Sequence, residues 1–508
     1  TICINLLIEL VSMQSSTTFL QSEIMSWAVM TLLLGIPLLL LALYLIDRNQ
    51  TRHALRRNYP LLARFRYLFE HLGEFFRQYF FAMDREEMPF NRAERSWVYR
   101  AAKKVDSTIA FGSTRDLKPA GTVLFANCAF PKLAEEGRET AAVIIGPHSR
   151  KPYQVTSVFH ISAMSYGAIS APAVLALSRG AKSAGVWMNT GEGGLSAEHL
   201  EGGADLVFQI GTAKYGVRDT NGGLCPERLR EVAAHEQVKM FEIKLSQGAK
   251  PGKGGVLPGS KVNAEIARVR AIPLGEDSFS PNRHPEVSSA EDLLDLIETV
   301  RSVSGKPVGI KAVIGDHRWL HELCVAIQER GVASAPDFIT VDGAEGGTGA
   351  APASLIDYMG LPLRESLPLV VDILHKFSLR QRIRVVASGK LINPAQIAWA
   401  LCVGADFATT ARGFMFSLGC IQAMQCNKNT CPTGITTHDK RLQRGLVVAN
   451  KRKRVANYAR SVRAEVAVIA HACGVQEPRQ LQRQHCRIVQ ADGSSLALDT
   501  LYPEAEKA

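Results

Sequence analysis

The stretch "IRVVASGKLINPAQIAWALCVGADFATTARG" (residues 383–413) contains two predicted strands and a helix-like segment between them. Each strand is a short apolar run, "IRVVASG" (383–389) and "DFATTARG" (406–413), that ends in small or polar residues. Strands that alternate with helices form parallel sheets, because the crossover helix returns the chain to the edge where it started. This unit therefore predicts two parallel strands.

The same alternation occurs six more times upstream. The runs are rich in β-branched or aromatic residues, and they are "SVFHISAMS" (157–165), "VWMNT" (186–190), "DLVFQIG" (205–211), "MFEIKL" (240–245), "PVGIKAV" (307–313) and "DFITVDG" (337–343). Eight such units over about 260 residues predict a (β/α)8 barrel, known as a TIM barrel. We expect it within residues 151–475, with a doubly wound sheet as the alternative.

Residues able to do chemistry follow the carboxyl ends of these strands. They are Met164, Ser165, Gln209, Lys244, Lys311, Asp342, Ser388 and Arg412. A barrel gathers all of its strand ends into one mouth, where barrel enzymes carry their active sites. This distribution favours the barrel over the doubly wound sheet.

The last two strands end in residues suited to an anion. Ser388, Gly389 and Lys390 follow the seventh strand, and Arg412 and Gly413 follow the eighth. In many barrels these two loops bind phosphate through backbone N–H groups and a helix N-terminus. Flavin mononucleotide (FMN) is the first candidate, a phosphorylated substrate is the second, and simple tight turns remain the third interpretation.

The glycine-rich stretch "GAEGGTGAAP" (343–352) follows the sixth strand. It lacks the G-x-G-x-x-G spacing of a dinucleotide site. Glycines such as Gly347 are better explained by close approach of the backbone to a flat ring or to a metal cluster.

Three cysteines lie within twelve residues, Cys420, Cys426 and Cys431, and Pro432 follows them. Thiolates hold iron–sulfur clusters, and a proline after the last ligand recurs in such motifs. Zinc completed by His438 is an alternative, although the spacings differ from the short knuckles of zinc sites. Inert buried thiols are the third reading.

Residues 27–46, "WAVMTLLLGIPLLLLALYLI", form an uncharged run long enough to cross a membrane as one helix. Arginines follow directly, at positions 48, 52, 56, 57, 64 and 66. By the positive-inside rule, the chain after the span is expected in the cytoplasm of a cell-membrane protein. A reducing cytoplasm also disfavours disulfides.

The remaining segments carry no predicted chemistry. Residues 1–26 are expected to be a tail, with an over-extended reading frame that starts at Met13 or Met25 as the alternative. Residues 47–150 are expected to be a basic flank with a helical cap or linker, and residues 476–508 a C-terminal tail. The net charge of +11 is concentrated locally and lacks the interleaved aromatic residues of RNA-binding motifs, so we expect no nucleic-acid partner.

Several motifs together resemble the FMN-binding synthase domain of glutamate synthases over about residues 150–470. They are "HISAMSYGAIS" (160–170), "NTGEGG" (189–194), "FEIKLSQGAKPGKGGVLPGSKV" (241–262), "DGAEGGTGAAP" (342–352), "ASGK" (387–390) and "GCIQAMQCNKNTCPTGITT" (419–437). The resemblance implies FMN at the barrel mouth and a [3Fe–4S] cluster bound by Cys420, Cys426 and Cys431. It also implies that 2-iminoglutarate, formed from 2-oxoglutarate and ammonia, is reduced to L-glutamate.

This chemistry assigns roles to strand-end residues. Lys311 and Lys244 are suitable cations for a dicarboxylate, with Ser165 and Gln247 as hydrogen-bond partners, and Lys311 is the first choice near the imine. The FMN-binding set is expected to be Met164, Ser165, Gln209, Lys311, Gly347, Ser388, Gly389, Lys390, Arg412 and Gly413. As the alternative, either lysine contacts the flavin or closes an ion pair with Glu242 or Glu192.

The sequence departs from complete glutamate synthases. Neither the glutamine-cleaving domain nor the β-helical domain of the family is found in it, so we expect free ammonia, a partner subunit or another amine as nitrogen source. Electrons are expected from ferredoxin or a partner reductase. The segment "SPNRHPEVSSAEDL" (280–293) keeps only part of a histidine-rich family loop. A membrane-tethered electron-transfer or redox-sensing module without turnover is the competing function.

Overall fold

A computed structural model describes residues 25, 27, 29–106 and 108–503. Its contacts divide the chain into two units, Thr1–Arg92 and Ala93–Ala508. Most of the expected tail, residues 1–24, lies outside the described residues.

The first unit is helical. Its elements are the helix Val29–Asn49, α2 (Ala54–Asn58), α3 (Leu62–Phe76) and the π-helical turn η1 (Arg77–Phe81). Within the described residues, Val29–Asn49 is the one helix that is long and apolar enough to cross a membrane. This agrees with the run at 27–46 in length and composition, and membrane insertion itself stays a prediction.

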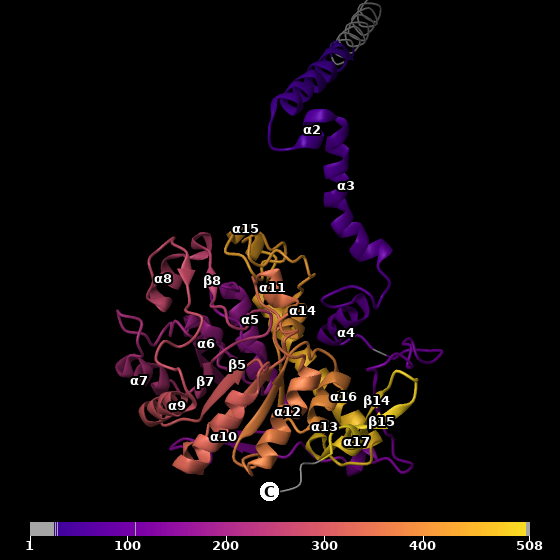
Figure 1. Cartoon of the computed structure of the whole chain (residues 1–508). Helices are drawn as coiled ribbons and strands as arrows, with labels where there is room; N and C mark the ends of the chain where they lie inside the picture. The colour runs from indigo at the N-terminus through magenta and orange to yellow at the C-terminus, as the bar shows by residue number, and fades with distance from the viewer. Residues whose placement is uncertain (1–24, 26, 28, 107, 504–508) are drawn as a thin grey trace, which may run out of the picture. The chain divides into compact units, whose positions relative to one another are not determined.

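The second unit contains a closed barrel of eight parallel strands (Figure 1). In chain order they are β4 (Phe159–Ile161), β5 (Met188–Asn189), β6 (Leu206–Ile210), β7 (Val238–Lys244), β10 (Val308–Ala312), β11 (Phe338–Asp342), β12 (Arg384–Ser388) and β13 (Phe407–Thr410). Seven lie within one of the eight apolar runs, and β7 overlaps the run at 240–245 but begins two residues earlier, at Val238. Strand β13 pairs with β4 to close the ring. The (β/α)8 prediction is confirmed.

Helices cover the barrel. The longer ones are α5 (Ala171–Ala184), α7 (Pro226–Ala234), α9 (Ala290–Ser304), α10 (Arg318–Arg330), α12 (Leu363–Lys376) and α13 (Pro394–Val403). Shorter helices occur in the connecting segments, namely α6 (Ala197–Gly202), α8 (Ala264–Arg270), α11 (Ala353–Ile356), α14 (Arg412–Leu418) and α15 (Lys440–Gln443). Local sequence sets their ends: Asn393 caps the start of α13 by accepting a hydrogen bond from the Gln396 N–H, and Pro394 occupies its first turn.

A small hairpin closes the amino-terminal end of the barrel. Its strands are β2 (Val143–Ile145) and β3 (Tyr153–Val155). Ile145 and Val155 pack in one buried cluster with side chains near the strand starts, namely Trp187, Val207, Met240, Phe338, Val386 and Phe407. The apolar plug leaves the carboxyl ends as the polar end of the barrel.

Residues 93–150 of the expected linker and the described part of the expected tail belong to the second unit. Helix α4 (Arg92–Lys103) contacts the long helix α16 (Val448–Ala472), with Trp97 and Tyr458 ring centroids 6.2 Å apart. Strand β1 (Val123–Phe125) pairs with β14 (Cys486–Val489), which pairs with β15 (Ser495–Ala497); helix α17 (Leu498–Leu501) follows. The region after residue 475 is therefore largely ordered structure that completes a three-stranded sheet.

Strand β1 lies far in sequence from β14 and β15, so no local sequence pattern predicts that β1 pairs with β14. The remaining two-stranded sheet, β8 (Val256–Leu257) with β9 (Ser278–Phe279), belongs to the segment between β7 and α9. Short 3-10 turns fill the other loops at η2 (Ala134–Glu136), η3 (Gly191–Gly193), η4 (Gly259–Lys261), η5 (Val332–Ser334), η6 (Pro478–Gln480) and η7 (Arg483–His485).

Candidate active site at the barrel mouth

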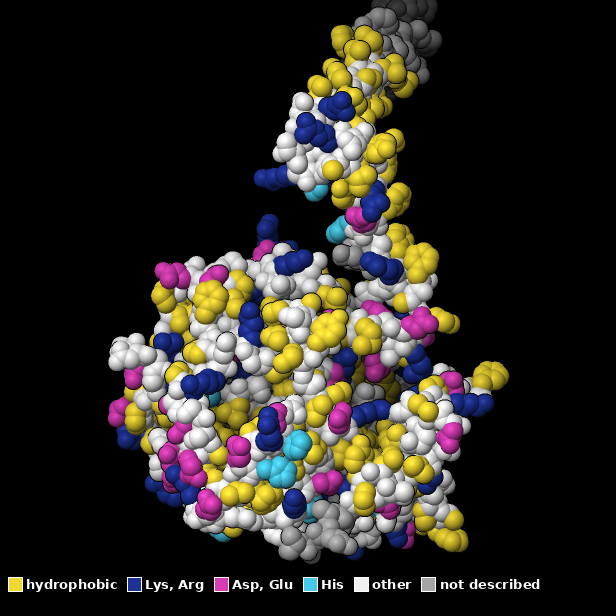
Figure 2. All heavy atoms as spheres, in the orientation of Figure 1, with side chains coloured by type: hydrophobic (Ala, Val, Ile, Leu, Met, Phe, Trp, Pro, Cys, Tyr) yellow, Lys and Arg dark blue, Asp and Glu magenta, His cyan; other side chains and the backbone are white. Residues whose placement is uncertain are grey.

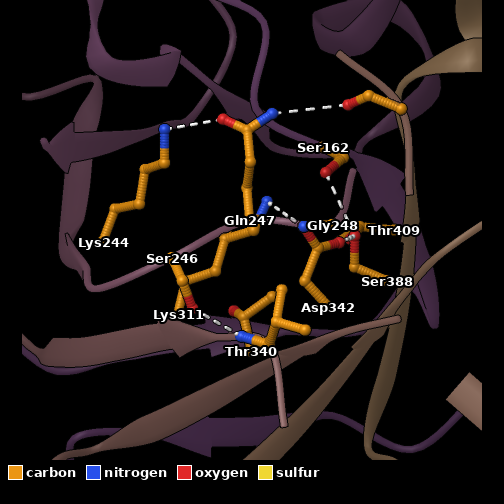
Figure 3. Close-up of polar contacts among 12 residues, drawn as sticks. Ser162, Lys244, Ser246, Gln247, Gly248, Lys311, Thr340, Asp342, Ser388 and Thr409 are labelled. Atoms are coloured by element: carbon orange, nitrogen blue, oxygen red, sulfur yellow. Dashed lines mark hydrogen bonds and ion pairs between the residues drawn. The ribbon is translucent and has the colours of Figure 1, made fainter. Parts of the chain in front are cut away.

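Two buried lysines lie at the ends of neighbouring strands. Lys244 ends β7 and Lys311 lies in β10, and the two residues are directly paired across the sheet. The Lys244 Nζ donates to Glu192 Oε2 at 2.8 Å and to Gln247 Oε1 at 2.7 Å. The alternative ion pair between Lys244 and Glu192 is thus present. Figure 3 shows the second contact of Lys244, with Gln247.

Lys311 pairs with Asp342, a strand-end residue to which the sequence assigned no role. Its Nζ lies 3.3 Å from Asp342 Oδ2 at the end of β11. Asp342 also accepts hydrogen bonds from the Gly248 N–H at 2.9 Å and from Ser388 Oγ at 2.7 Å. Burial disfavours the charged lysine, but Asp342 and Glu242 outweigh it and raise the pKa of Lys311.

Glu242 lies inside the barrel below this layer. Its Oε1 accepts hydrogen bonds from Asn189 and Gln209, and its Oε2 accepts one from Thr340 at 2.6 Å. Gln209, predicted to contact a flavin, therefore uses its side-chain N–H to hold Glu242 at 2.6 Å. The network fixes a buried carboxylate close enough to act on the charge of Lys311.

The expected anion-binding residues follow adjacent strands, because β12 and β13 pair through Ser388 and Thr409. Ser388 is buried, Gly389 has a φ of 138° that favours glycine, and Lys390 has a φ of 49°. Arg412 begins α14 next to Gly413, and its Nη2 donates to the Thr348 carbonyl at 2.8 Å. Two cations beside a tight turn and a strand-end hydroxyl fit a phosphate.

The glycine-rich loop after β11 lies close to these groups. The Gly347 carbonyl accepts from Gln247 Nε2 at 3.4 Å, and a Cβ at Gly347 would stand 2.4 Å from the Arg412 guanidinium. Gly347 therefore lies between Gln247, which contacts Lys244, and the Arg412 guanidinium. The predicted approach of this backbone to a flat ring or a metal cluster stays a prediction.

Met164 and Ser165 follow β4, and the backbone of this loop touches the loop after β5. A Cβ at Gly191 would lie 2.5 Å from the Ser165 N and 2.7 Å from the Met164 carbonyl carbon. Met164 is buried and Ser165 is partly exposed. The structure records no hydrogen bond from the Ser165 side chain to Lys244 or Lys311, so its predicted role depends on a bound ligand.

Cys420, Cys426 and Cys431 line one cavity of about 40 Å³ beside α14, and Arg412 lines it as well. In the described part of the chain, no group of three or more His, Cys, Asp or Glu side chains is close enough to hold one metal ion. Thiolates of an iron–sulfur cluster bind different iron atoms, so they need not converge on one point. Three thiols around a single cavity fit a cluster better than a lone ion.

His438, the fourth ligand of the zinc alternative, does not line this cavity. Its Nε2 instead hydrogen-bonds with the Gly167 carbonyl at 2.8 Å. Burial raises the pKa of Cys420 to about 11, and the neighbouring thiols add to the rise. Burial also opposes ionisation of Cys431, but a hydrogen bond with the Thr433 hydroxyl, with the two atoms 3.4 Å apart, helps to lower its pKa overall.

A buried lysine holds the cysteine loop. The Lys261 Nζ donates to the carbonyls of Cys426 at 2.7 Å, Thr436 at 2.8 Å and Ala168 at 3.4 Å. Tyr99 of α4 donates to the Cys420 carbonyl at 2.5 Å. The predicted linker thus contributes to the cysteine site, which the sequence did not indicate.

Sequence reasoning assigned no role to two further groups at the mouth, Lys250 and His284. Lys250 is buried near Glu192 and Lys244, and burial foremost, then the charge of Lys244, lowers its pKa to about 8. Burial disfavours the charged form of Glu192, but Lys244 and Lys250 lower its pKa to about 2. His284, within the divergent 280–293 loop, hydrogen-bonds with the Lys244 carbonyl at 3.0 Å. Lys250 lies in the quoted motif at 241–262, so its charge was the available signal.

Residues 118–476 match the family described as "Conserved region in glutamate synthase". The chain belongs to the glutamate synthase family. The match covers the barrel, the cysteine site and α16, which agrees with the extent of the motifs that suggested the family.

Relatives of the family include proteins of different length. A "Glutamate synthase large subunit-like protein YerD" of Bacillus subtilis is 41% identical over 92% of this chain and 96% of that protein. An "Archaeal-type glutamate synthase [NADPH]" of Thermotoga maritima is 34% identical over 63% of this chain and 60% of that protein. A "Glutamate synthase large subunit-like protein" of Rhizobium meliloti is 28% identical over 76% of this chain and 88% of that protein.

Proposed function

We propose that this chain is a flavin-dependent oxidoreductase that reduces 2-iminoglutarate, formed from 2-oxoglutarate and ammonia or an amine, to L-glutamate. Membership of the glutamate synthase family supports an oxidoreductase. The observation that carries the specific reaction is the pair of adjacent buried lysines at the strand ends, each held by a carboxylate.

The residues at the mouth fit FMN. Ser388, Gly389, Lys390, Arg412 and Gly413 would hold its phosphate, because they combine two cations with the turns after two adjacent strands. When bound, the flavin supplies a hydride to the imine carbon, which is the cofactor's own chemistry. The protein must then hold the imine and exclude water.

The lysines suit a dicarboxylate substrate. Lys311 stays protonated because Asp342 and Glu242 raise its pKa, so it can neutralise a carboxylate or give a proton to the imine nitrogen. Lys244 would exchange part of its contact with Glu192 for a substrate carboxylate. Gln247 accepts from Lys244 through Oε1, and its side-chain N–H group, now 3.4 Å from the Gly347 carbonyl, would be a hydrogen-bond partner for the substrate. Ser165 would complete the set from the β4 side.

The cysteine cavity fits a [3Fe–4S] cluster. Cys420, Cys426 and Cys431 would be its ligands, and the cluster would supply one-electron transfer to the flavin. Ferredoxin or a partner reductase would be the electron donor, and free ammonia, an amine or a partner subunit would supply the nitrogen. The related archaeal-type enzyme of Thermotoga maritima carries NADPH in its name, which supports a partner reductase that takes electrons from NADPH as one candidate donor.

We also propose that the helix Val29–Asn49 anchors the protein in the cell membrane as a single span, with the barrel in the cytoplasm. Its apolar length and the arginines that follow it support this orientation.

The test begins with the purified full chain in detergent. Its absorbance spectrum, iron and acid-labile sulfide are measured, and the chemically reduced protein is then mixed with 2-oxoglutarate, with and without ammonia. We expect flavin reoxidation and glutamate formation only when 2-oxoglutarate and ammonia are both present. In Lys311→Met we expect neither flavin reoxidation nor glutamate. A reduced flavin that the complete mixture leaves unchanged would refute synthase activity and favour an electron-transfer module.

A further inference from the structure

One face of α3 (Leu62–Phe76) is apolar and exposed. Leu62, Phe65, Phe69 and Phe76 recur at helical spacing, and they are 70%, 58%, 65% and 43% exposed. The π-helical turn that follows adds exposed Tyr79, Phe80 and Phe81. Figure 2 shows hydrophobic side chains gathered on the surface of the first unit. An apolar strip of this kind indicates a binding surface.

The opposite face of the same helix is occupied. The Tyr67 ring packs edge-on against His53, with centroids 5.3 Å apart, and the Arg56 guanidinium lies 4.8 Å from its centroid. Both partners flank or belong to α2 (Ala54–Asn58). The helix is therefore already packed on its polar side and open on its apolar side within the first unit.

An ion pair ties α3 to the end of the apolar helix. Arg64 donates from Nε and Nη2 to the two Asp47 carboxylate oxygens at 2.7 and 2.8 Å, and the Leu61 N–H adds a third bond to Asp47 at 3.1 Å. Asp47 is fully buried by these contacts. The start of α3 is thus held at the end of the helix Val29–Asn49.

We propose that α3 lies flat on the cytoplasmic surface of an anionic bilayer, with Phe65, Phe69 and Phe76 inserted among the headgroups and upper acyl chains. The proposal rests on the membrane anchor. A helix held at the end of a span lies at headgroup level, where aromatic side chains are stable. Arg48, Arg52, Arg57 and Arg66 lie nearby in sequence and complement lipid phosphates.

The test uses the full chain in nanodiscs of phosphatidylglycerol and phosphatidylcholine whose acyl chains are brominated. Phe69→Trp places a fluorophore on the apolar face, and Tyr67→Trp is the matched control on the opposite face of the same helix. The wild-type signal, which includes Trp27, is subtracted. We expect bromine to quench the added fluorescence of Phe69→Trp at least twofold more than that of Tyr67→Trp.

Three outcomes overturn the proposal and are distinguishable. A chain that carbonate washing releases from vesicles refutes the anchor and this proposal together. An anchored chain whose two tryptophans are quenched equally refutes the surface contact alone, and protection of Phe69→Trp from an aqueous quencher without bromine quenching would assign the face to a protein partner. The double variant Phe65→Ser/Phe69→Ser checks the same contact. We expect amide hydrogen exchange across α3 to be faster than in the wild type, and exchange in the barrel to be unchanged.

Discussion

Replacing Lys261 with Met should loosen the cysteine loop specifically. Lys261 is buried, and its ammonium donates to the carbonyls of Cys426, Thr436 and Ala168. Met has a similar length and no donor, so the two closest carbonyls lose their partner at about 1–3 kcal/mol each. The Met variant also avoids the free-energy cost of burying a charged ammonium group, and this offsets part of the loss. The net cost should be about 2–4 kcal/mol of local stability.

The assay is amide hydrogen exchange of the full chain, followed by mass spectrometry of the peptide that covers residues 420–437. A local cost of 2 kcal/mol or more corresponds to exchange roughly 30-fold faster or more. Lys306→Met is the matched control, because Lys306 is also buried and donates to the His235 and Val238 carbonyls, close to the start of β7. It should leave the 420–437 peptide at the wild-type rate. Equal exchange in wild type and Lys261→Met would refute the reasoning.

Three further outcomes are expected. Lys250 carries its charge below its pKa of about 8, so the KM for 2-oxoglutarate should rise between pH 7 and 9.5, and Lys250→Arg, which keeps its charge, should remove that rise; a pH-independent KM in the wild type would contradict this. Asp342→Asn removes the nearer of the two carboxylates that raise the pKa of Lys311 and should lower kcat about 100-fold in steady-state assays, whereas an unchanged kcat would contradict a role of the Lys311–Asp342 pair in proton transfer. Gly180→Ala would place a Cβ 2.5 Å from an α16 side chain and should lower the unfolding free energy by about 1–3 kcal/mol in urea titrations, whereas Gly349→Ala, with open space around it, should be near neutral.

Local sequence was sufficient for the barrel strands. Parallel strands buried on both faces appear as continuous apolar runs, and β6, β7, β10, β11 and β13 are buried along almost their whole length. The strand ends then followed from where each run turned polar. The same reasoning underestimated residues 476–503, because β14 is stabilised by pairing with β1 more than 300 positions away in the chain.

The sequence by itself determined which chemical groups stand at the mouth, since a parallel barrel places every residue after a strand at the same end. Lys244, Lys311, Ser388 and the cysteine spacing were all available in this way. Only the tertiary structure decided their partners: Glu192 reaches Lys244 across 52 positions, and Tyr99 reaches Cys420 across 321. These pairings form because the closed barrel and the segments packed on it bring distant parts of the chain together. Local periodicity and residue spacing contain no information about such long-range contacts.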